Sequence, residues 1–270
     1  MTGSEPAVPR IDTSKPHPAR VYDWFLGGKD NYPVDEALGR HIMSIDNRAK
    51  HVAQTNRWFM HRATRWMAGQ AGVRQYLDIG TGIPTEPNLH QIAQGVAPES
   101  RVVYTDNDPI VLTHAEALLR STSEGVTDYI QADVREPDRI LEQARKILDF
   151  KQPIALSLVA LLHFVGDEHQ PYDLVHQLVD ALPSGSYLVL TQLTADFDPL
   201  AVQRGVDMYA AGGVTLAPRS YAEVGRFFEG LEVEEPGIVR LTQWHPELGV
   251  GEVAEGDEAA SLYAGVGRKA

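Results

Sequence analysis

Three aspartates follow apolar stretches of the sequence at places where they could meet one ligand. Asp78 leads into the turn Gly80–Gly82, Asp106 follows a second apolar run, and Asp133 follows a third. Glycines between a strand and a helix let a ligand approach the backbone, and the helix N-terminus offers free N–H groups. A carboxylate after the second strand can accept hydrogen bonds from ribose hydroxyls, and one after the third can accept a hydrogen bond from an adenine amine. The set predicts an adenosine-containing ligand.

Each feature taken alone has a plainer explanation. A glycine turn can serve only to reverse the chain, and an aspartate at a strand end is often a helix N-cap or a solvated charge. The turn also departs from the dinucleotide fingerprint G-x-G-x-x-G, because Thr85 occupies the third glycine position and Pro84 precedes it. The joint occurrence of the acids at successive strand ends favours the functional interpretation.

A sheet is needed to bring these residues together, and the sequence predicts one. Apolar runs alternate with helical patterns, which is typical of βαβ units in a parallel sheet. Strands are predicted over Gln75–Ile79, Arg101–Thr105, Thr127–Gln131, Ile154–Val159 and Tyr187–Gln192, with helices over 87–95, 109–120, 137–148 and 171–182. A capping box of Ser220 and Glu223 predicts a helix over 220–230, and strands over 231–235 and 261–266 complete the sheet. The prediction is an α/β fold with a Rossmann-like, seven-stranded, mostly parallel sheet and helices on both faces.

The chain divides into three parts on this interpretation. Residues 1–18 carry four prolines among polar residues and are predicted to be a disordered tail. Residues 19–72 are predicted to form an N-terminal helical cap, with helices over 19–26, 35–43 and 48–68. Residues 73–270 form the predicted core. Within it, the weakly periodic stretch 193–217 is a candidate lid over the carboxyl edge of the sheet.

Composition excludes several classes of partner. The net charge of −13 would repel a phosphate backbone, so no nucleic-acid partner is expected. The chain has no cysteine and no HExxH pattern, so no metal site is expected. The longest apolar stretch, Ile154–Leu162, is far short of the ~20 residues that span a bilayer, and the N-terminus lacks the apolar core of a signal peptide. A cytoplasmic location without membrane contact is predicted by elimination, and the oligomeric state is unknown.

The strand-end motifs resemble those of the class I S-adenosylmethionine (SAM)-dependent methyltransferases. These are D-x-G-x-G after strand one, an acid after strand two and an Ala-Asp pair after strand three. Within that class the chain resembles a bacterial family of S-adenosyl methyltransferases with no assigned substrate. The residues that carry this resemblance are Arg20–Tyr32, Asp78–Gly82, Val102–Pro109 and Tyr263–Lys269. The resemblance implies a Rossmann-like core, an added helical cap and SAM as the cofactor.

The class pattern also implies roles for particular residues. The methionine end of SAM would lie against Asp78, Gly80, Thr81 and Gly82, the ribose against Asp106 and Asn107, the adenine against Asp133 and Val134, and the strand-four side against Ala160 and Leu161. The segment from Tyr22 to Tyr32 could cover the cofactor, with Tyr22 and Asn31 as its contacts; the alternative is a simple packing helix. A SAM site holds no pyrophosphate, so it does not need the third glycine.

Methyl transfer chiefly needs a positioned acceptor, with a base where the acceptor must lose a proton. His163, just after strand four, is the candidate catalytic base, although a structural histidine is the alternative. The leading prediction is a SAM-dependent methyltransferase that acts on an unidentified acceptor, expected to be a small molecule. The competing interpretations are a non-catalytic SAM-binding regulatory protein and an NAD(P)-dependent oxidoreductase.

Overall fold

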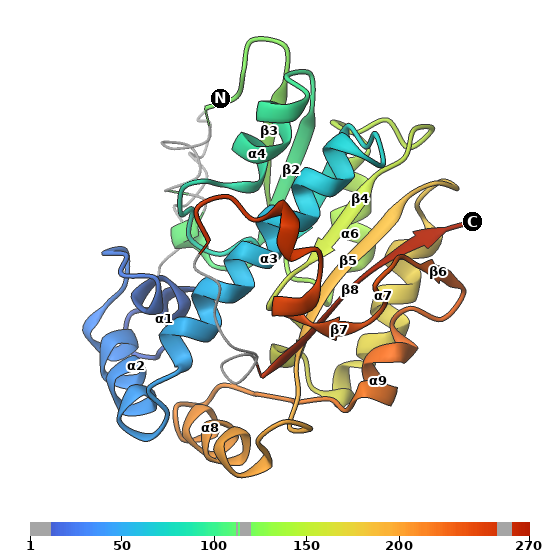
Figure 1. Cartoon of the computed structure of the whole chain (residues 1–270). Coiled ribbons are helices and arrows are strands. Elements are labelled where there is room, and N and C mark those ends of the chain that lie inside the picture. Colours follow the sequence, from blue (N-terminus) through green and yellow to red (C-terminus); the bar gives the residue numbers. More distant parts are fainter. Residues whose placement is uncertain (1–11, 112, 114–119, 253–260) are drawn as a thin grey trace, which may run out of the picture.

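The computed structural model describes residues 12–111, 113, 120–252 and 261–270, and within them one eight-stranded sheet forms the centre of the molecule (Figure 1). The strands are β1 (Gln75–Ile79), β2 (Arg101–Asp106), β3 (Val126–Gln131), β4 (Ala155–Leu158), β5 (Tyr187–Leu193), β6 (Leu231–Val233), β7 (Val239–Arg240) and β8 (Leu262–Lys269). Their order is β3-β2-β1-β4-β5-β8-β6, with β7 also paired to β8. Strands β1 to β5 are parallel, and β8 is antiparallel to β5, β6 and β7. The predicted mostly parallel sheet is confirmed, with β7 as an eighth strand.

Apart from α8 (Pro199–Ala211), which lies in the stretch predicted only as a candidate lid, the described α-helices match predicted ones with shifts at their ends. They are α1 (Pro18–Phe25), α2 (Pro33–Ile45), α3 (Ala49–Gly69), α4 (Leu89–Val96), α6 (Pro137–Ala144), α7 (Pro171–Asp180) and α9 (Tyr221–Arg226). Several begin with proline, whose missing N–H costs nothing in a first helical turn. Ser220 and Glu223 form the predicted capping box of α9. Most of the helix predicted over 109–120 lies outside the described residues.

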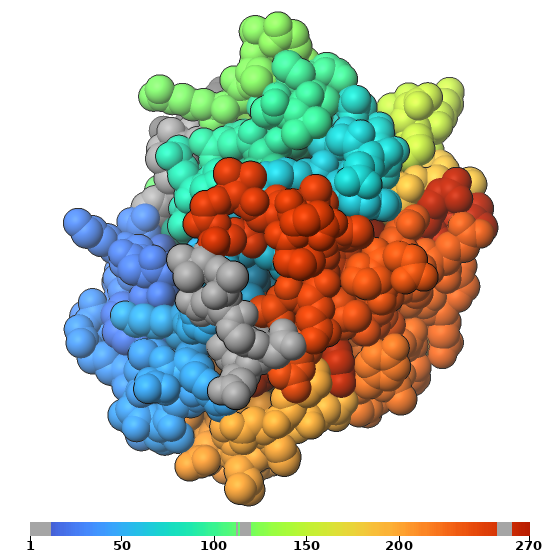
Figure 2. Space-filling model, in the orientation of Figure 1, coloured from blue at the N-terminus to red at the C-terminus, as the bar shows by residue number. Residues whose placement is uncertain are grey.

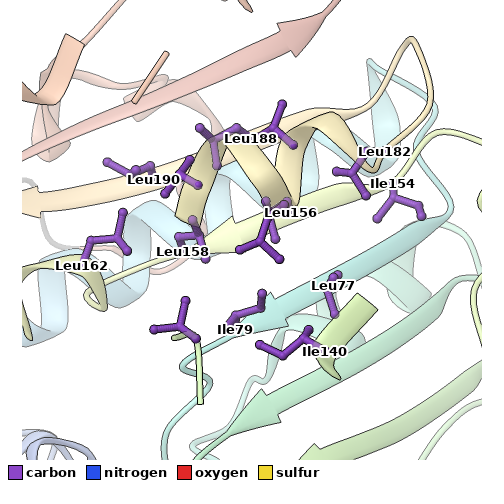
Figure 3. Packing of buried hydrophobic residues seen from close by; sticks show 14 of the residues in the cluster. Leu77, Ile79, Ile140, Ile154, Leu156, Leu158, Leu162, Leu182, Leu188 and Leu190 are labelled. Atoms are coloured by element: carbon purple, nitrogen blue, oxygen red, sulfur yellow. The ribbon is translucent and has the colours of Figure 1, made fainter. Parts of the chain in front are cut away.

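The two faces of the sheet are covered by different helices. On one face, leucines of β4 and β5 point toward α6 and α7, as Figure 3 shows for Leu156, Leu158 and Leu190. On the other face, α3 packs Phe59 and Met67 against the sheet. Both faces of the central strands are therefore apolar, as expected for strands buried on both sides.

Helices α1, α2 and α8 form a separate layer beside the N-terminal part of α3 (Figure 1). Val21 and Phe25 of α1, Ile42 of α2, Ala53 of α3 and Met208 of α8 make one apolar cluster. The predicted lid segment therefore packs, through α8, against helices of the predicted cap.

The segment that follows β7 lies across α3, as the space-filling view shows (Figure 2). The Arg62 guanidinium donates hydrogen bonds to the carbonyls of Leu241 and Trp244, and Arg65 donates one to the Leu248 carbonyl at 3.0 Å. These bonds hold the segment against the outer side of α3. No helix among the described residues has both the length and the apolar character needed to cross a membrane.

Candidate functional site

A cavity of about 400 Å³ lies at the carboxyl ends of the parallel strands. Apart from Asn31, every residue predicted to contact a cofactor lines this cavity: Tyr22, Asp78, Gly80, Thr81, Gly82, Asp106, Asn107, Asp133, Val134, Ala160 and Leu161. Residues from α1, α3 and the segment after α8 complete the walls. The fold thus brings the three predicted strand-end acids to one space.

The glycine turn after β1 forms part of the cavity wall. Gly80 and Gly82 have φ angles of +74° and +66°, which L side chains rarely adopt. The N–H groups of Gly80 and Thr81 donate to the Thr105 carbonyl of β2 at 2.7 and 3.2 Å, which fixes the turn to the sheet. A Cβ atom on Gly80 would lie 2.6 Å from Cδ1 of Leu161, whereas one on Gly82 would meet nothing within 4 Å. At position 80, glycine is therefore favoured both by the left-handed backbone conformation and by the lack of room for a side chain. At position 82 it is favoured by the backbone conformation alone.

Asp106 is held by two backbone N–H groups. Its Oδ2 accepts a hydrogen bond from the Gly82 N–H at 2.8 Å, and its Oδ1 accepts one from the Asp108 N–H at 3.0 Å. The side chain is buried, and burial raises the pKa of its carboxyl group. Because a carboxylate has about four acceptor positions, it can still accept hydrogen bonds from a ligand. The bond to Gly82 couples the acid after β2 to the turn after β1.

Asp133 lies beyond β3 in a different electrostatic setting. Partial burial would raise the pKa of its carboxyl, but hydrogen bonds from Arg135 and from the Asn107 amide outweigh this and lower the pKa to about 2. The Asn107 Nδ2 lies 2.9 Å from Oδ2, and the Arg135 Nε lies 2.8 Å from Oδ1. Asp133 therefore stays ionised at neutral pH, and it fixes the side chain of Asn107.

Asp78 and Arg57 bring opposite charges to another part of the cavity. The Thr81 hydroxyl donates to Asp78 Oδ2 at 2.5 Å, and burial raises the pKa of the Asp78 carboxyl. Arg57 of α3 lines the same space, and its guanidinium donates to the carbonyls of Thr85 and Pro87. Burial lowers the pKa of Arg57, while the charge of Asp78 opposes that shift. No sequence motif marks Arg57, and sequence reasoning missed it.

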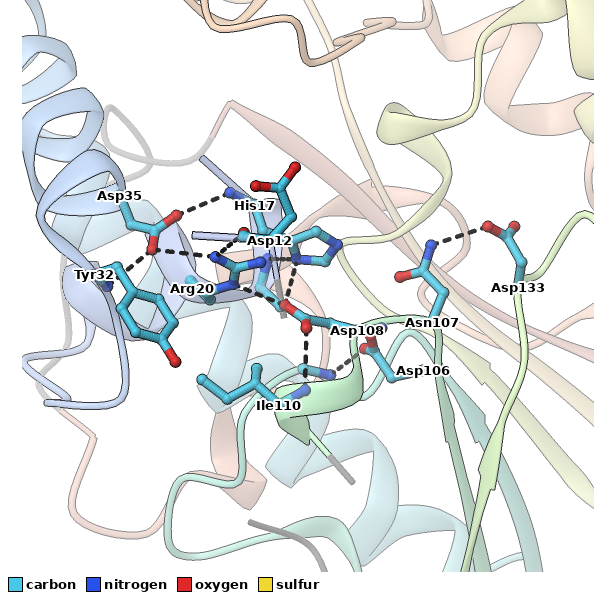
Figure 4. Close-up of polar contacts among 12 residues, drawn as sticks. Asp12, His17, Arg20, Tyr32, Asp35, Asp106, Asn107, Asp108, Ile110 and Asp133 are labelled. Carbon is cyan, nitrogen blue, oxygen red and sulfur yellow. Dashed lines mark hydrogen bonds and ion pairs between the residues drawn. The ribbon is translucent and has the colours of Figure 1, made fainter. Parts of the chain in front are cut away.

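The N-terminal segment ties α1 and α2 to the loop after β2 (Figure 4). The Arg20 Nε donates to Asp108 Oδ2 at 2.8 Å, and both side chains are almost fully buried. His17 Nδ1 lies 3.2 Å from the same oxygen, and the His17 N–H donates to Asp35 Oδ1 at 2.9 Å. Residues 16–19 line the cavity as a result. Sequence reasoning assigned these residues partly to a disordered tail and did not identify this network.

A chain of hydrogen bonds crosses the wall between α1, α3 and the end of β4. The Ala160 N–H donates to the Thr191 hydroxyl, which donates to Asn56 Oδ1, both at 2.8 Å. The Asn56 amide donates in turn to the Tyr22 hydroxyl at 2.9 Å. Ala160 has a φ of +55°, a strained conformation for a residue with a side chain. The backbone after β4 is therefore held in an unusual shape by a polar network that sequence reasoning did not foresee.

Two predicted residues lie outside this cavity. The Asn31 amide donates to Asp23 Oδ2 at 2.8 Å and to the Gly28 carbonyl at 3.1 Å, and it does not line the cavity. His163 lines a neighbouring, smaller chamber instead. Burial, assisted by the positive charge of Arg219, lowers the pKa of His163 to about 3. The imidazole is therefore neutral at physiological pH.

Comparison with known proteins identifies the family. A family model described as S-adenosyl methyltransferase matches residues 4–270. The chain belongs to this family. It is a SAM-dependent methyltransferase, and SAM is its cofactor. No curated protein matches the chain.

Solved structures of similar sequence agree with this family membership. A DUF574 family protein from Streptomyces avermitilis is 48% identical with a TM-score of 0.93, over 97% of this chain and 100% of that chain. A candidate methyltransferase from Thermobifida fusca is 39% identical with a TM-score of 0.86, over 96% of each chain. A SAM-dependent methyltransferase from Anabaena variabilis is 14% identical with a TM-score of 0.51, over 98% of this chain and 99% of that chain, and shares the fold.

The residues of the cavity fit SAM by their charges. Among the described residues that line it are three carboxylates, of Asp78, Asp106 and Asp133, and two guanidiniums, of Arg57 and Arg135. The carboxylates outnumber the guanidiniums in this lining, which complements the net positive charge of SAM. A pyrophosphate would instead favour a positive lining. The charge balance therefore suits the sulfonium cofactor better than a dinucleotide.

Proposed function

We propose that this methyltransferase transfers the methyl group of SAM to a small-molecule acceptor, in a cavity closed by the helical cap of residues 19–72. The observation that carries the proposal is the convergence of Asp78, Asp106 and Asp133 on one cavity beside the left-handed glycine turn. The cavity volume of about 400 Å³ lies within the range typical of small-ligand sites.

Each end of the cofactor would meet a different group of residues. Asp106 would accept hydrogen bonds from the ribose hydroxyls, with Asn107 beside it. Asp133 and Val134 would hold the adenine. Asp78 would face the methionine ammonium, and Arg57 would face the methionine carboxylate, because these two side chains bring opposite charges to the same part of the wall.

When bound, SAM supplies an electrophilic methyl group on a sulfonium. The contribution of the protein is then mainly to orient the acceptor and exclude water. A general base works best when its pKa lies near the working pH. The pKa of about 3 at His163 therefore suits the imidazole to hydrogen bonding rather than to removal of a proton. His163 is assigned here as a residue that positions the acceptor.

Other aspects of function stay predictions from the sequence. A cytoplasmic location and the absence of a nucleic-acid partner rest on composition and charge. The site itself supports a small acceptor, because the cavity is lined by the acids, the glycine turn and residues of α1 and α3.

Isothermal titration of the full chain tests the cofactor assignment directly. S-Adenosylhomocysteine (SAH) and SAM should each bind with a stoichiometry of one, and NAD should not bind. Arg57→Met should weaken SAH more than it weakens adenosine, because only SAH carries the methionine carboxylate. Equal losses for SAH and adenosine would contradict the role given to Arg57, and NAD binding without SAH binding would overturn the proposed function.

A further inference from the structure

The backbone just after β4 is held by side chains of β5 and α3. Pairing of β4 with β5 ends at Leu158 and Leu190. Beyond this pair, the Ala160 N–H donates to the Thr191 hydroxyl of β5 at 2.8 Å, and that hydroxyl donates to Asn56 Oδ1 of α3 at 2.8 Å. The side chains of Thr191 and Asn56 are almost fully buried. Side-chain hydrogen bonds therefore hold the backbone beyond the point where the strand pairing ends.

Each hydroxyl in this network has its hydrogen committed in one direction. A hydroxyl carries one hydrogen, so the Thr191 hydroxyl, which accepts from Ala160, uses its own hydrogen on Asn56. The Asn56 amide donates to the Tyr22 hydroxyl of α1 at 2.9 Å, and this hydroxyl donates to the Ala53 carbonyl of α3 at 2.9 Å. Hydrogen bonds in such a series strengthen one another. Removal of one hydroxyl should therefore weaken the bonds on both sides of it.

Ala160 and Leu161 are the residues through which this network reaches the cofactor cavity. Ala160 has a φ of +55°, a left-handed conformation that an alanine keeps only where its surroundings impose it. Both residues line the cavity. The Leu161 side chain lies against the glycine turn, with its Cδ1 atom 2.6 Å from the position that a Cβ on Gly80 would occupy. A change in the Ala160 backbone would therefore move Leu161 relative to the turn.

We propose that Thr191 is a positioning residue for the cofactor, and that its hydroxyl, held by Asn56 and Tyr22, keeps the Ala160 backbone in the shape that binds SAM. This proposal rests on the proposed function. Thr191 is not among the described residues that line the cofactor cavity, so it acts through Ala160. A site that already has its binding shape loses less free energy when the ligand binds. Without the hydroxyl, the backbone after β4 relaxes, and the cofactor must restore its shape.

The SAH affinity of Thr191 variants of the full chain, measured by isothermal titration, tests this role. Thr191→Val keeps the shape of the side chain and removes the hydroxyl. It should weaken SAH binding by about 3- to 12-fold, as expected for the loss of one hydrogen bond between neutral groups. Thr191→Ser keeps the hydroxyl and should bind SAH within about twofold of the parent. If Thr191→Val fails to fold, Thr191→Cys replaces it, because a thiol is a weak hydrogen-bond acceptor.

Ser186 provides a matched control at the opposite end of the same two strands. Its hydroxyl accepts a hydrogen bond from the Ile154 N–H at 3.1 Å, and the side chain is buried. It is not among the described residues that line the cofactor cavity. Ser186→Ala should lower the melting temperature, as Thr191→Val does, and should keep the SAH affinity of the parent. Equal losses of SAH affinity in the two variants would assign the effect to general destabilisation and overturn the proposal.

Tyr22→Phe tests whether the network acts as one unit. It removes the hydroxyl that accepts from Asn56 and keeps the aromatic ring that lines the cavity. In a chain with isotope-labelled alanine, the NMR resonance of the Ala160 amide should shift in Tyr22→Phe and in Thr191→Val, and it should stay close to its parent position in Thr191→Ser. The double variant should lose less SAH binding free energy than the sum of the two single losses, because residues in one network are not independent.

Three results would overturn the positioning role while SAH binding by the parent chain upholds the cofactor site. They are an unshifted Ala160 resonance in Thr191→Val, an SAH affinity of that variant within about twofold of the parent, and losses that simply add in the double variant. If the parent chain does not bind SAH, the proposed function is wrong, and the positioning role is lost with it.

Discussion

Replacement of Asp106 tests the central feature of the site. Asp106→Asn keeps the shape of the side chain but removes its charge and turns one acceptor oxygen into a donor amide. In the parent chain both oxygens accept backbone N–H groups, from Gly82 and from Asp108. Either orientation of the new amide therefore places its NH₂ group against one of these N–H groups. Asp106→Ala removes both acceptors.

The expected losses of affinity follow from the strength of charged hydrogen bonds. A hydrogen bond to a charged group contributes about 1.5–3 kcal/mol, and one between neutral groups about 0.5–1.5 kcal/mol. The asparagine should therefore lose about 1–1.5 kcal/mol of SAH binding, and the alanine about 1.5–3 kcal/mol. At about 1.4 kcal/mol per factor of ten, these correspond to roughly 5- to 12-fold and 12- to 150-fold weaker binding.

Stability should respond in a separate measurement. The unpaired backbone N–H left by Asp106→Asn should lower the free energy of unfolding by about 1–3 kcal/mol. For a chain of this size, each kcal/mol corresponds to a decrease in Tm of about 2–4 °C. This cost is present with and without ligand, so it does not by itself weaken SAH binding.

Titration calorimetry with SAH at a temperature where all variants are folded gives the affinities, and thermal unfolding gives the stabilities. Asp128→Asn is the matched control, because Asp128 is an exposed carboxylate on β3 that does not line the cavity. It removes the same charge from the neighbouring strand, away from the cavity, and should change neither quantity. If Asp106→Asn and Asp106→Ala both bind SAH within twofold of the parent, Asp106 does not hold the ribose and the assignment is wrong.

Four further substitutions probe the surroundings of the cavity. Gly80→Ala should lower the melting temperature and weaken SAH binding, because its φ of +74° costs an L residue about 1–2 kcal/mol and its Cβ would contact a leucine at 2.6 Å; Gly82→Ala, with open space around it, should lose less. Arg20→Met should lower the free energy of unfolding by about 3–5 kcal/mol, measured in urea, because it removes the guanidinium partner of the buried Asp108 carboxylate, which keeps the His17 imidazole and the Ile110 N–H. His163→Phe should flatten the pH dependence of stability. The pKa of His163 falls from 6.5 to about 3 on folding, so below pH 6.5 the unfolded state binds the extra proton and the parent loses stability as the pH decreases. Titration of His163 should lower the free energy of unfolding of the parent chain by about 2 kcal/mol between pH 7.5 and pH 5, measured by urea unfolding.

Each of these predictions can be contradicted. If Gly80→Ala and Gly82→Ala lost equal amounts of melting temperature and SAH affinity, the contact with the neighbouring side chain would not matter. The left-handed backbone alone would then set the requirement for glycine. Wild-type stability in Arg20→Met would show that the remaining contacts with His17 and the Ile110 N–H are enough to hold the carboxylate of Asp108. A pH dependence in His163→Phe as steep as that of the parent would show that the imidazole is not held neutral by burial.

The sheet and most of the site could be predicted because their signals are local in the sequence. Each parallel strand is a short apolar run, and each strand-end acid directly follows such a run, so the fold brings Asp78, Asp106 and Asp133 together without further information. The Ser220 capping box also lies within one helical turn. Strand β7 was not predicted, since two residues, Val239 and Arg240, are too few to show a periodic pattern.

The residues that sequence reasoning missed reach the site through tertiary packing. Arg57 and Asn56 lie on a long helix whose pattern indicates only one apolar face, and nothing in it shows which end meets the cavity. His17 precedes α1 in a proline-rich segment, and its place depends on a contact with Asp108, far along the chain. The position of His163 depends on the path of the backbone after Ala160, whose positive φ is unusual for alanine and directs the next turn toward the neighbouring chamber.

A network of hydrogen bonds connects the walls of the cofactor cavity and of the neighbouring chamber. Asp106 fixes the glycine turn on one side of the cofactor cavity, while on the other side Thr191 connects the Ala160 backbone to Asn56. Asn56 in turn holds the Tyr22 hydroxyl, so α1, α3 and the end of β4 share one network. Tyr22, Asn56 and Ala160 line both the cofactor cavity and the neighbouring chamber. The position of α1 against the cofactor cavity therefore depends on the same hydrogen bonds that hold the backbone after β4.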